Sequence, residues 1–300
     1  MTLPTFTAFF MTPAKVNLGL KIVCKRDDGY HDLYTVMEPV SLADSLYCEF
    51  CPALENSFSV QCPQLLDLDA DDNLIVKAAR LMAGIARKHG LEKVGSWDFF
   101  LDKKIPAGAG MGGGSSNAAG VIKLLDKFFD LKLNPTELVQ AATMIGADVP
   151  FFLNPELSLI EGIGDRITSL GGARSRYYLI VKPPFAINTA SAYSSLNASL
   201  KERSANYDVE QFKAASQSIH YILENDFEGS IMARYPLLAD IKQGLMESDG
   251  VLGALMSGSG SVVYAIYPDL KTASLAEITA RRQWQEGGCL FYLARNISSG

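Results

Sequence analysis

The sequence predicts a protein of mixed helices and strands that is divided into two domains. Its 300 residues, 48% of them hydrophobic, are enough to bury a core in each of two domains. Alternating strand patterns and amphipathic helix patterns follow one another along the chain. The pattern changes after the segment GGARSR at 171–176. We therefore expect one domain over residues 1–170 and a second over residues 171–300.

The composition argues against nucleic acid and membranes as partners. The net charge is −6, with acidic and basic residues interspersed and no block of Lys or Arg. The N-terminal MTLPTFTAFF lacks the basic start and long apolar run of a signal peptide. No stretch approaches the roughly 18 apolar residues of a membrane span. The five cysteines are an odd number, which fits reduced thiols. We expect a cytoplasmic protein.

The segment AKVNLGLKIV at 14–23 alternates between apolar and polar residues. Such alternation is typical of a half-buried strand, in which successive side chains point to opposite faces. Lys15 and Asn17 are two residues apart, so their side chains project from the same face. That face lies opposite the apolar residues Val16, Leu18, Leu20 and Ile22.

A helix and a strand are predicted before a glycine-rich segment. The amphipathic pattern at 71–90 predicts a helix with Asp72 as its N-cap and Gly90 at its end, and Asn73 is an alternative cap. Residues 97–105, WDFFLDKKI, have the composition of a strand. This strand leads directly into the glycines.

Two helices are predicted after the glycine-rich segment. The first spans 117–130 and would be capped by Ser115 or Ser116. The second has a capping residue, a proline at its first position, a glutamate at its third and a terminal glycine. These are Asn134, Pro135, Glu137 and Gly146.

The C-terminal part again alternates strands with helices. Its central feature is a strand, a Gly/Ser turn and a second strand over 251–267. Gly258 and Gly260 in that turn either form a plain hairpin or bring a second loop close to a ligand. The remaining segments are strands at 177–184 and 289–295 and helices at 208–228, 235–248 and 272–284.

The glycine-rich segment IPAGAGMGGGSSNAAG, at 105–120, matches no common nucleotide loop fully. It has no lysine, which excludes a Walker A loop. Gly108, Gly110 and Gly113 have GxGxxG spacing, but a helix follows where a dinucleotide fold needs a second parallel strand. The protein-kinase loop needs a valine where Ser115 stands, and its companion motifs are absent.

The chemistry of this segment nevertheless favours phosphate. Backbone amides of 108–114 can form a concave nest, and the positive end of the following helix can face it. Ser115 and Ser116 add hydroxyl groups for phosphate or Mg²⁺. The alternative is a flexible surface loop, in which the glycines would have no ligand.

Three segments together resemble the signatures of the GHMP kinases. Pro106, three residues and GMGGGSSNAA resemble the second signature, PAKVNLGLKI at 13–22 the first, and LMSGSGSVVYAI at 255–266 the third. The resemblance implies an α+β, two-domain fold. Its N-terminal domain is similar to the second domain of ribosomal protein S5, and its C-terminal domain is ferredoxin-like. ATP and Mg²⁺ are the implied cofactors.

Two further segments narrow the resemblance. DDGYHDL at 27–33 and GADVPFF at 146–152 resemble members that phosphorylate the 2-hydroxyl of CDP-methylerythritol in the non-mevalonate route to isoprenoids. The implied partner is therefore this small molecule, and the implied oligomeric state is a monomer or weak homodimer.

The resemblance assigns roles to individual residues. Lys15 and Asp148 would be catalytic, with Asp148 accepting the hydroxyl proton. The substrate residues would be Asn17, Tyr30, His31, Thr189 and Tyr193, with the aromatic rings and the imidazole around the cytosine. The ATP residues would be Asn73 and the loop Pro106, Ala107, Gly108, Ala109, Gly110, Met111, Gly112, Gly113, Gly114, Ser115 and Ser116.

One departure from the family pattern leaves the metal ligand open. Relatives often have Gly-Leu-Gly-Ser-Ser where this chain has glycines at 112–114. Ser115 or Ser116 would have to replace the missing hydroxyl. Two other functions remain open: a homoserine or mevalonate kinase, and a nucleotide-binding regulator that has lost catalysis.

Overall fold

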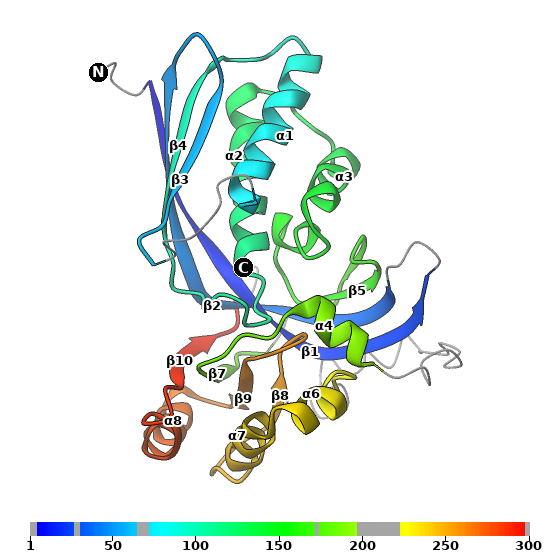
Figure 1. Cartoon of the computed structure of the whole chain (residues 1–300), viewed down its shortest axis with the longest axis vertical. Helices are drawn as coiled ribbons and strands as arrows, with labels where there is room; N and C mark the ends of the chain where they lie inside the picture. The colour runs from blue at the N-terminus through cyan, green and yellow to red at the C-terminus, as the bar shows by residue number, and fades with distance from the viewer. Residues whose placement is uncertain (1–4, 27–30, 65–71, 172–173, 197–222, 298–300) are drawn as a thin grey trace. The chain divides into compact units, whose positions relative to one another are not determined.

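The computed structural model describes residues 5–26, 31–64, 72–171, 174–196 and 223–297. It divides the chain into two compact units (Figure 1). The first unit comprises residues 1–14, 43–105 and 112–154, and the second comprises 15–42, 106–111 and 155–300. The grouping therefore does not follow the sequence order: two N-terminal segments belong with the C-terminal part. A domain boundary at 170/171 stays a prediction.

The first unit is a sheet with helices packed on it. Two long strands run through both units, β1 (Phe6–Lys25) and β2 (His31–Pro52). Within the first unit β1 pairs with β2, and β2 pairs antiparallel with β4 (Gly95–Asp102). β4 in turn pairs in parallel with β3 (Ser57–Gln61). Because parallel neighbours need a crossover connection, helix α1 (Leu74–Lys88) lies between β3 and β4 in the chain.

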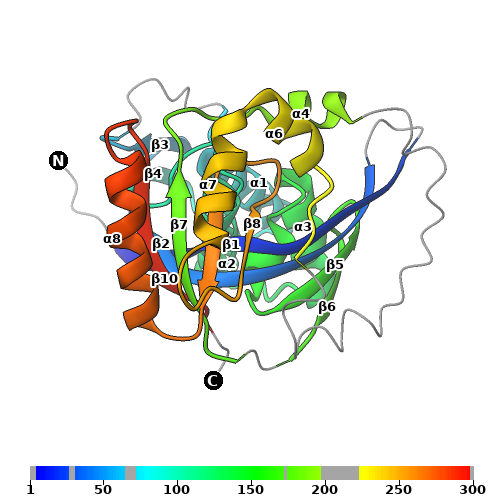
Figure 2. The same cartoon turned by 90° about the horizontal axis from the view of Figure 1, so that it is seen from below.

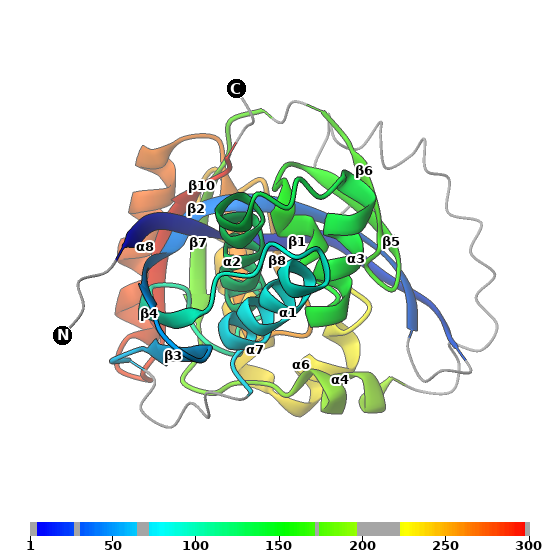
Figure 3. The same ribbon diagram turned by 90° about the horizontal axis from the view of Figure 1, so that it is seen from above.

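The core of the first unit forms where β4 meets the helices. Alternate residues of β4 are buried, as period-two geometry requires, and Trp97 is fully enclosed. The Trp97 ring meets Phe128 edge-on at 4.7 Å between centroids. Figure 3 shows α1 beside α2. The remaining helices of this unit are α2 (Gly113–Phe129), α3 (Pro135–Ile145) and the short 3-10 helix η1 (Pro150–Leu153).

The helix termini confirm one sequence prediction and correct two. α3 has the predicted capping box and ends at Gly146. The N-cap of α1 is Asn73, whose side-chain oxygen accepts from the Ile75 amide, so the prediction of Asp72 is wrong. The prediction of a Ser115 or Ser116 cap is also wrong. α2 already begins at Gly113 because Gly112, at φ 68°, adopts the left-handed conformation that lets the chain enter the helix earlier.

The second unit contains an antiparallel sheet in the order β10–β7–β9–β8 (Figure 2). Its strands are β7 (Tyr177–Lys182), β8 (Gly253–Met256), β9 (Val263–Tyr267) and β10 (Leu290–Arg295). Helical segments connect β7 to β8 and β9 to β10, and a tight loop connects β8 to β9. This succession and strand order confirm the predicted ferredoxin-like fold. The described helices are α4 (Thr189–Ser195), α6 (Glu228–Arg234), α7 (Pro236–Met246) and α8 (Leu270–Trp284).

The first strand is buried on both faces in the second unit. Its apolar residues, including Leu20 and Ile22, join the core formed with the helices and the antiparallel sheet. Lys15 and Asn17, on the other face, are only 3% and 1% exposed. The prediction of a half-buried strand is therefore wrong here, and its polar face lies in a buried site. In the same unit β2 pairs with β5 (Ser158–Gly162), and β5 pairs with β6 (Arg166–Ser169).

All five cysteines are free thiols. Across the residues that the structure describes, no helix is both long enough and apolar enough to span a membrane. Cytoplasmic localisation and the oligomeric state stay predictions.

Candidate active site

The glycine-rich loop has the backbone geometry of an anion-binding nest. Gly108, Gly110 and Gly112 have φ values of 59°, 74° and 68°, so every second residue lies in the left-handed region. Alternation of this kind turns successive amides toward one concavity. The 17-residue helix α2 follows directly, and its first-turn amides lack intrahelical partners. The backbone conformation of this loop is therefore the one that a phosphate-binding loop needs.

Gly110 is in close backbone contact with the loop between β8 and β9, which is part of the same unit. A Cβ atom at residue 110 would lie 2.1 Å from the Ser257 carbonyl oxygen, so no other residue fits without displacing backbone. The Ser257 hydroxyl donates to the Gly110 carbonyl at 2.9 Å. The amide of Val262 donates to the Ala109 carbonyl at 3.3 Å. The third signature thus holds the second in place.

The two polar residues of β1 form a buried network. The Lys15 ammonium donates to the Asn17 side-chain oxygen at 2.6 Å, as their shared face predicts. The Asn17 amide group donates to the Thr35 hydroxyl at 2.8 Å, and Thr35 donates to the Gly19 carbonyl at 2.6 Å. The Lys15 backbone amide donates to the Met111 carbonyl at 3.0 Å. The lysine therefore lies directly beside the glycine loop.

The predicted base-binding residues meet on β2 and α4. The rings of His31 and Tyr193 are stacked, with centroids 4.6 Å apart and planes 22° apart. Thr189 lies one helical turn before Tyr193 and its hydroxyl is 3.1 Å from that of Ser259. Burial, followed by the charge of Lys25, lowers the pKa of His31 below its usual value, which favours a neutral imidazole. Tyr30 lies outside the described residues.

In the first unit, a buried carboxylate organises the start of α2. Asp44 is fully buried and accepts from the Lys103 ammonium at 2.5 Å. It also accepts from the backbone amides of Lys104 and Ile105, both at 2.8 Å, and from the Asn117 side chain at 3.1 Å. One side chain thus joins the end of β4 to the first turn of α2.

Asn73, which is also predicted to bind ATP, lies next to the start of α2. Asn73 caps α1 through its side-chain oxygen, which accepts from the Ile75 amide at 2.9 Å. A Cβ at Gly114 would be 3.5 Å from Leu74, so the starts of α1 and α2 are neighbours.

Asp148 lies in a tight turn between α3 and η1. The turn is closed by a bond from the Val149 amide to the Gly146 carbonyl at 3.1 Å, and Pro150 begins η1. The side chain is half-buried. Since this aspartate belongs to the first unit and Lys15 to the second, their catalytic roles stay predictions.

The described residues contain no group of three or more His, Cys, Asp or Glu able to hold a metal ion. Mg²⁺ normally binds through one or two protein groups together with substrate phosphates and water, so such a cage is not required. Among the residues that the structure describes, two buried side-chain polar atoms have no hydrogen-bond partner, the Trp97 indole nitrogen and the Ser116 hydroxyl in the first turn of α2. Of these, only the hydroxyl oxygen is a possible ligand for Mg²⁺. These residues therefore fit an ion that is carried by a nucleotide.

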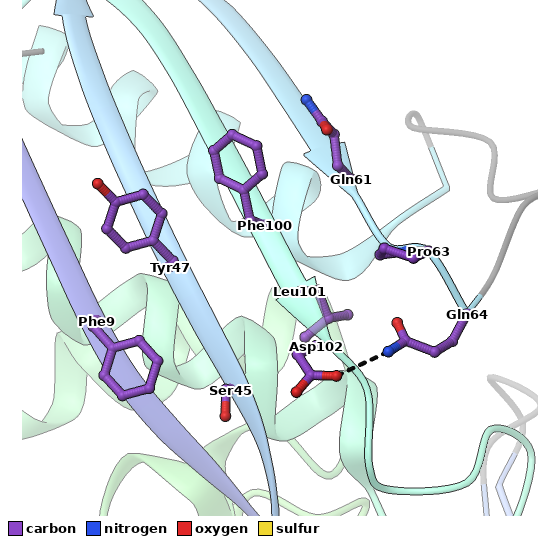
Figure 4. A pocket seen from close by; sticks show the side chains of 9 residues that line it. All are labelled: Phe9, Ser45, Tyr47, Gln61, Pro63, Gln64, Phe100, Leu101 and Asp102. Carbon is purple, nitrogen blue, oxygen red and sulfur yellow. Dashed lines mark hydrogen bonds between the residues drawn. The ribbon is translucent and has the colours of Figure 1, made fainter.

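A hollow of about 390 Å³ lies on the outward face of the first unit's sheet (Figure 4). Phe9, Tyr47 and Phe100 line it, and Gln64 donates to Asp102 at its rim at 2.8 Å. None of the predicted site residues lines this hollow, so it contributes nothing to the candidate site.

Sequence reasoning missed several residues that support the site. Asp44, Thr35 and Ser257 each act through contacts with residues far away in the chain, so no local motif marks them. The third signature, at 255–266, contains Ser257, but this motif does not show which groups the Ser257 hydroxyl contacts.

The fold and the site define a class of protein, and comparison with known proteins gives the same class. The family model of the GHMP kinases N terminal domain matches residues 73–155, and that of the GHMP kinases C terminal matches 202–284. The chain belongs to the GHMP kinases.

Its relatives are more specific. The 4-diphosphocytidyl-2-C-methyl-D-erythritol kinase of Syntrophotalea carbinolica is 36% identical over 281 residues, which cover 92% of this chain and 96% of the relative. The enzyme of the same name from Syntrophus aciditrophicus is 36% identical over 89% of this chain and 92% of its own.

Solved structures have the same fold. A 4-(cytidine 5'-diphospho)-2C-methyl-D-erythritol kinase has a TM-score of 0.77 and 29% identity, covering 98% of this chain and all of its own. A homoserine kinase from Cytophaga hutchinsonii has a TM-score of 0.76 over 99% of this chain and 96% of its own, but at 15% identity it shows the fold alone.

The contact at Gly110 predicts a large effect of one methyl group. Gly110→Ala should lower the free energy of unfolding by at least about 2 kcal/mol, because it combines left-handed strain with a clash against the Ser257 carbonyl. Gly84→Ala is the matched control: residue 84 is exposed in α1 with nothing within 4 Å, and the change should stabilise by about 0.5–1 kcal/mol. Urea denaturation measures both. Equal stability of Gly110→Ala and the wild type would contradict the close approach.

The buried carboxylate makes a second prediction. Asp44→Ala should cost about 3–5 kcal/mol of stability, because it leaves the Lys103 ammonium, 10% exposed, without its partner. Asp72→Ala, which removes an 84% exposed partner of Lys77, should cost less than about 1 kcal/mol. The two variants are compared by thermal and urea unfolding. A similar small loss in both would show that Asp44 does not organise this end of the unit.

Proposed function

We propose that this protein is an ATP-dependent kinase that transfers the γ-phosphate to the 2-hydroxyl of CDP-methylerythritol, in isoprenoid biosynthesis by the non-mevalonate pathway. The observation that carries the proposal is the bond from the Lys15 amide to the Met111 carbonyl, which places a buried lysine beside an anion-binding loop. The curated relatives at 36% identity carry the name of this kinase and match along almost the whole chain, which supports the choice of acceptor.

The protein's part in phosphoryl transfer is positioning and charge stabilisation. The amides of the glycine loop and the first turn of α2 hold the phosphates of ATP. Lys15 stabilises the acceptor oxygen and the negative charge that develops on the phosphoryl group. Asp148 accepts the hydroxyl proton as the acceptor oxygen bonds to the γ-phosphorus and the bond to the β–γ bridging oxygen breaks, leaving ADP. The Ser116 hydroxyl would be a protein ligand for Mg²⁺ bound with ATP, an ion that would neutralise phosphate charge.

The cytosine is recognised by the residues around His31 and Tyr193. A neutral imidazole offers one donor and one acceptor to the edge of a base. The two rings touch at 4.6 Å, which leaves no room for a base between them. The base therefore stacks on an outer face of this pair, or the pair separates to admit it. Thr189 and Asn17 hold the remainder of the acceptor.

A coupled assay of ADP release across alcohol acceptors tests this function. CDP-methylerythritol should support turnover, whereas homoserine and mevalonate should not, because neither fills a base site. Faster turnover with homoserine or mevalonate would replace the proposed acceptor. ATP binding without ADP release for every acceptor would indicate a regulator that has lost catalysis.

The catalytic roles are tested by two substitutions. Lys15→Ala and Asp148→Asn should each lower kcat by roughly 10²–10⁴-fold, the usual contribution of a positioned acid–base group, in a protein that still folds. Lys88→Ala and Asp240→Ala, at exposed positions, are the charge-matched controls and should keep the wild-type rate. A near wild-type kcat in Lys15→Ala or Asp148→Asn would remove that residue from the mechanism.

A further inference from the structure

Ser257 is a fully buried residue at the first position of the loop between β8 and β9. Its side chain is 0% exposed, and the proposed function gives it no contact with a substrate. None of the roles described above uses its hydroxyl. Its contacts nevertheless join two segments to which the proposed function assigns roles, and these segments lie 93 positions apart (110 − 17 = 93).

The hydroxyl bridges the glycine loop and strand β1. It donates to the Gly110 carbonyl at 2.9 Å and accepts from the Asn17 backbone amide at 3.3 Å. The Asn17 side-chain oxygen is a second possible acceptor for the Ser257 hydroxyl hydrogen, at 3.3 Å. The Gly110 carbonyl is closer to the hydroxyl and is therefore the preferred acceptor. That oxygen already accepts from the Lys15 ammonium at 2.6 Å. One hydroxyl group therefore connects the loop to the strand that carries the lysine.

The backbone around Ser257 is fixed on both sides. The Asn225 side chain donates to the carbonyls of Met256 at 2.7 Å and Gly258 at 2.8 Å. The Ser257 amide donates to the Val262 carbonyl at 3.0 Å. These hydrogen bonds fix the backbone that carries the Ser257 hydroxyl, so the hydroxyl can hold Gly110 and Asn17 in position.

We infer that Ser257 is a positioning residue that fixes the distance between the phosphate-binding loop and the Lys15–Asn17 pair. The inference rests on the proposed function, because it is that function which requires the two segments to be aligned. Small misplacements of reacting groups are costly in phosphoryl transfer, where the enzyme contributes mainly alignment. The residue would therefore affect turnover more than binding.

The first test is Ser257→Ala, assayed with ATP and CDP-methylerythritol. Removing the hydroxyl leaves the Gly110 carbonyl and the Asn17 amide without this partner. We expect kcat to fall roughly tenfold to 100-fold, as a displacement of less than about 1 Å would cause. The KM values for both substrates should change by less than about threefold, since the groups that bind them remain.

Ser261→Ala is the matched control for lost stability. Ser261 lies in the same loop, is also 0% exposed, and its hydroxyl donates to the Phe185 carbonyl at 2.7 Å. Ser261→Ala therefore loses one buried hydrogen bond, whereas Ser257→Ala loses two, and it does so without touching residue 17 or 110. Both variants should lower the melting temperature, and only Ser257→Ala should lose turnover. Equal losses of kcat in the two variants would overturn the inference.

A double-mutant cycle with Asn17→Ala tests whether Ser257 acts through the side chain of Asn17. If Ser257 acts through Asn17, the double variant should be at most about threefold slower than Asn17→Ala alone. Because Asn17→Ala keeps the backbone amide that donates to Ser257, multiplied losses would mean that Ser257 acts through that amide and Gly110 rather than through the Asn17 side chain. A slow Asn17→Ala beside a wild-type rate in Ser257→Ala would overturn the inference. A wild-type rate in Asn17→Ala would instead refute the proposed role of Asn17, while a slow Ser257→Ala would still support positioning through Gly110.

Discussion

The close approach of the Gly110 backbone to the Ser257 carbonyl is the constraint on which the candidate site depends. A single Cβ atom at residue 110 would lie 2.1 Å from that oxygen, so the contact exists only because the residue is glycine. The contact brings the second and third signatures together, and the Met111 carbonyl then meets the Lys15 amide of the first. Glycine costs conformational entropy in the folded chain. Here the hydrogen bonds that the loop carbonyls accept from Lys15, Ser257 and Val262 offset that cost. The loop amides remain able to turn toward an anion.

The second requirement is that the polar groups beside this contact are buried with partners. Lys15, Asn17 and Thr35 are almost inaccessible, and each donates at 2.8 Å or less. A buried polar group without a partner would be strongly destabilising, whereas a connected network is rigid. The lysine is therefore presented in one orientation before any ligand arrives. Such preorganisation is what phosphoryl transfer asks of a protein.

Local signals in the sequence predicted the parts of the fold that local interactions form. The capping box at Asn134 and the strand–loop–strand at 251–267 were correct because their causes lie within a few residues. The start of α2 was wrong because serine caps are common, and nothing local showed that Gly112 would adopt a left-handed conformation. The alternating pattern of β1 predicted a half-buried strand, whereas its polar face is buried as well. Its burial results from Ser257, 240 positions away, and from Thr35 on another strand. The stacking of His31 on Tyr193 fits the family resemblance but has no local signature of its own.

The departure from the family pattern at residue 113 has a physical reason in the first unit. Where relatives often have serine, a Cβ atom would lie 2.7 Å from the Lys103 ammonium and 3.0 Å from Ile105. A lysine side chain could ordinarily move aside, but this one is held by Asp44 at 2.5 Å, and the Ile105 amide is bound to the same carboxylate. The space at the first turn of α2 is therefore already taken by a cation and its anchor. A serine at 113 would have to shift the Lys103 ammonium, which Asp44 holds, and the Ile105 side chain, so in this chain the glycine leaves room for the buried ion pair.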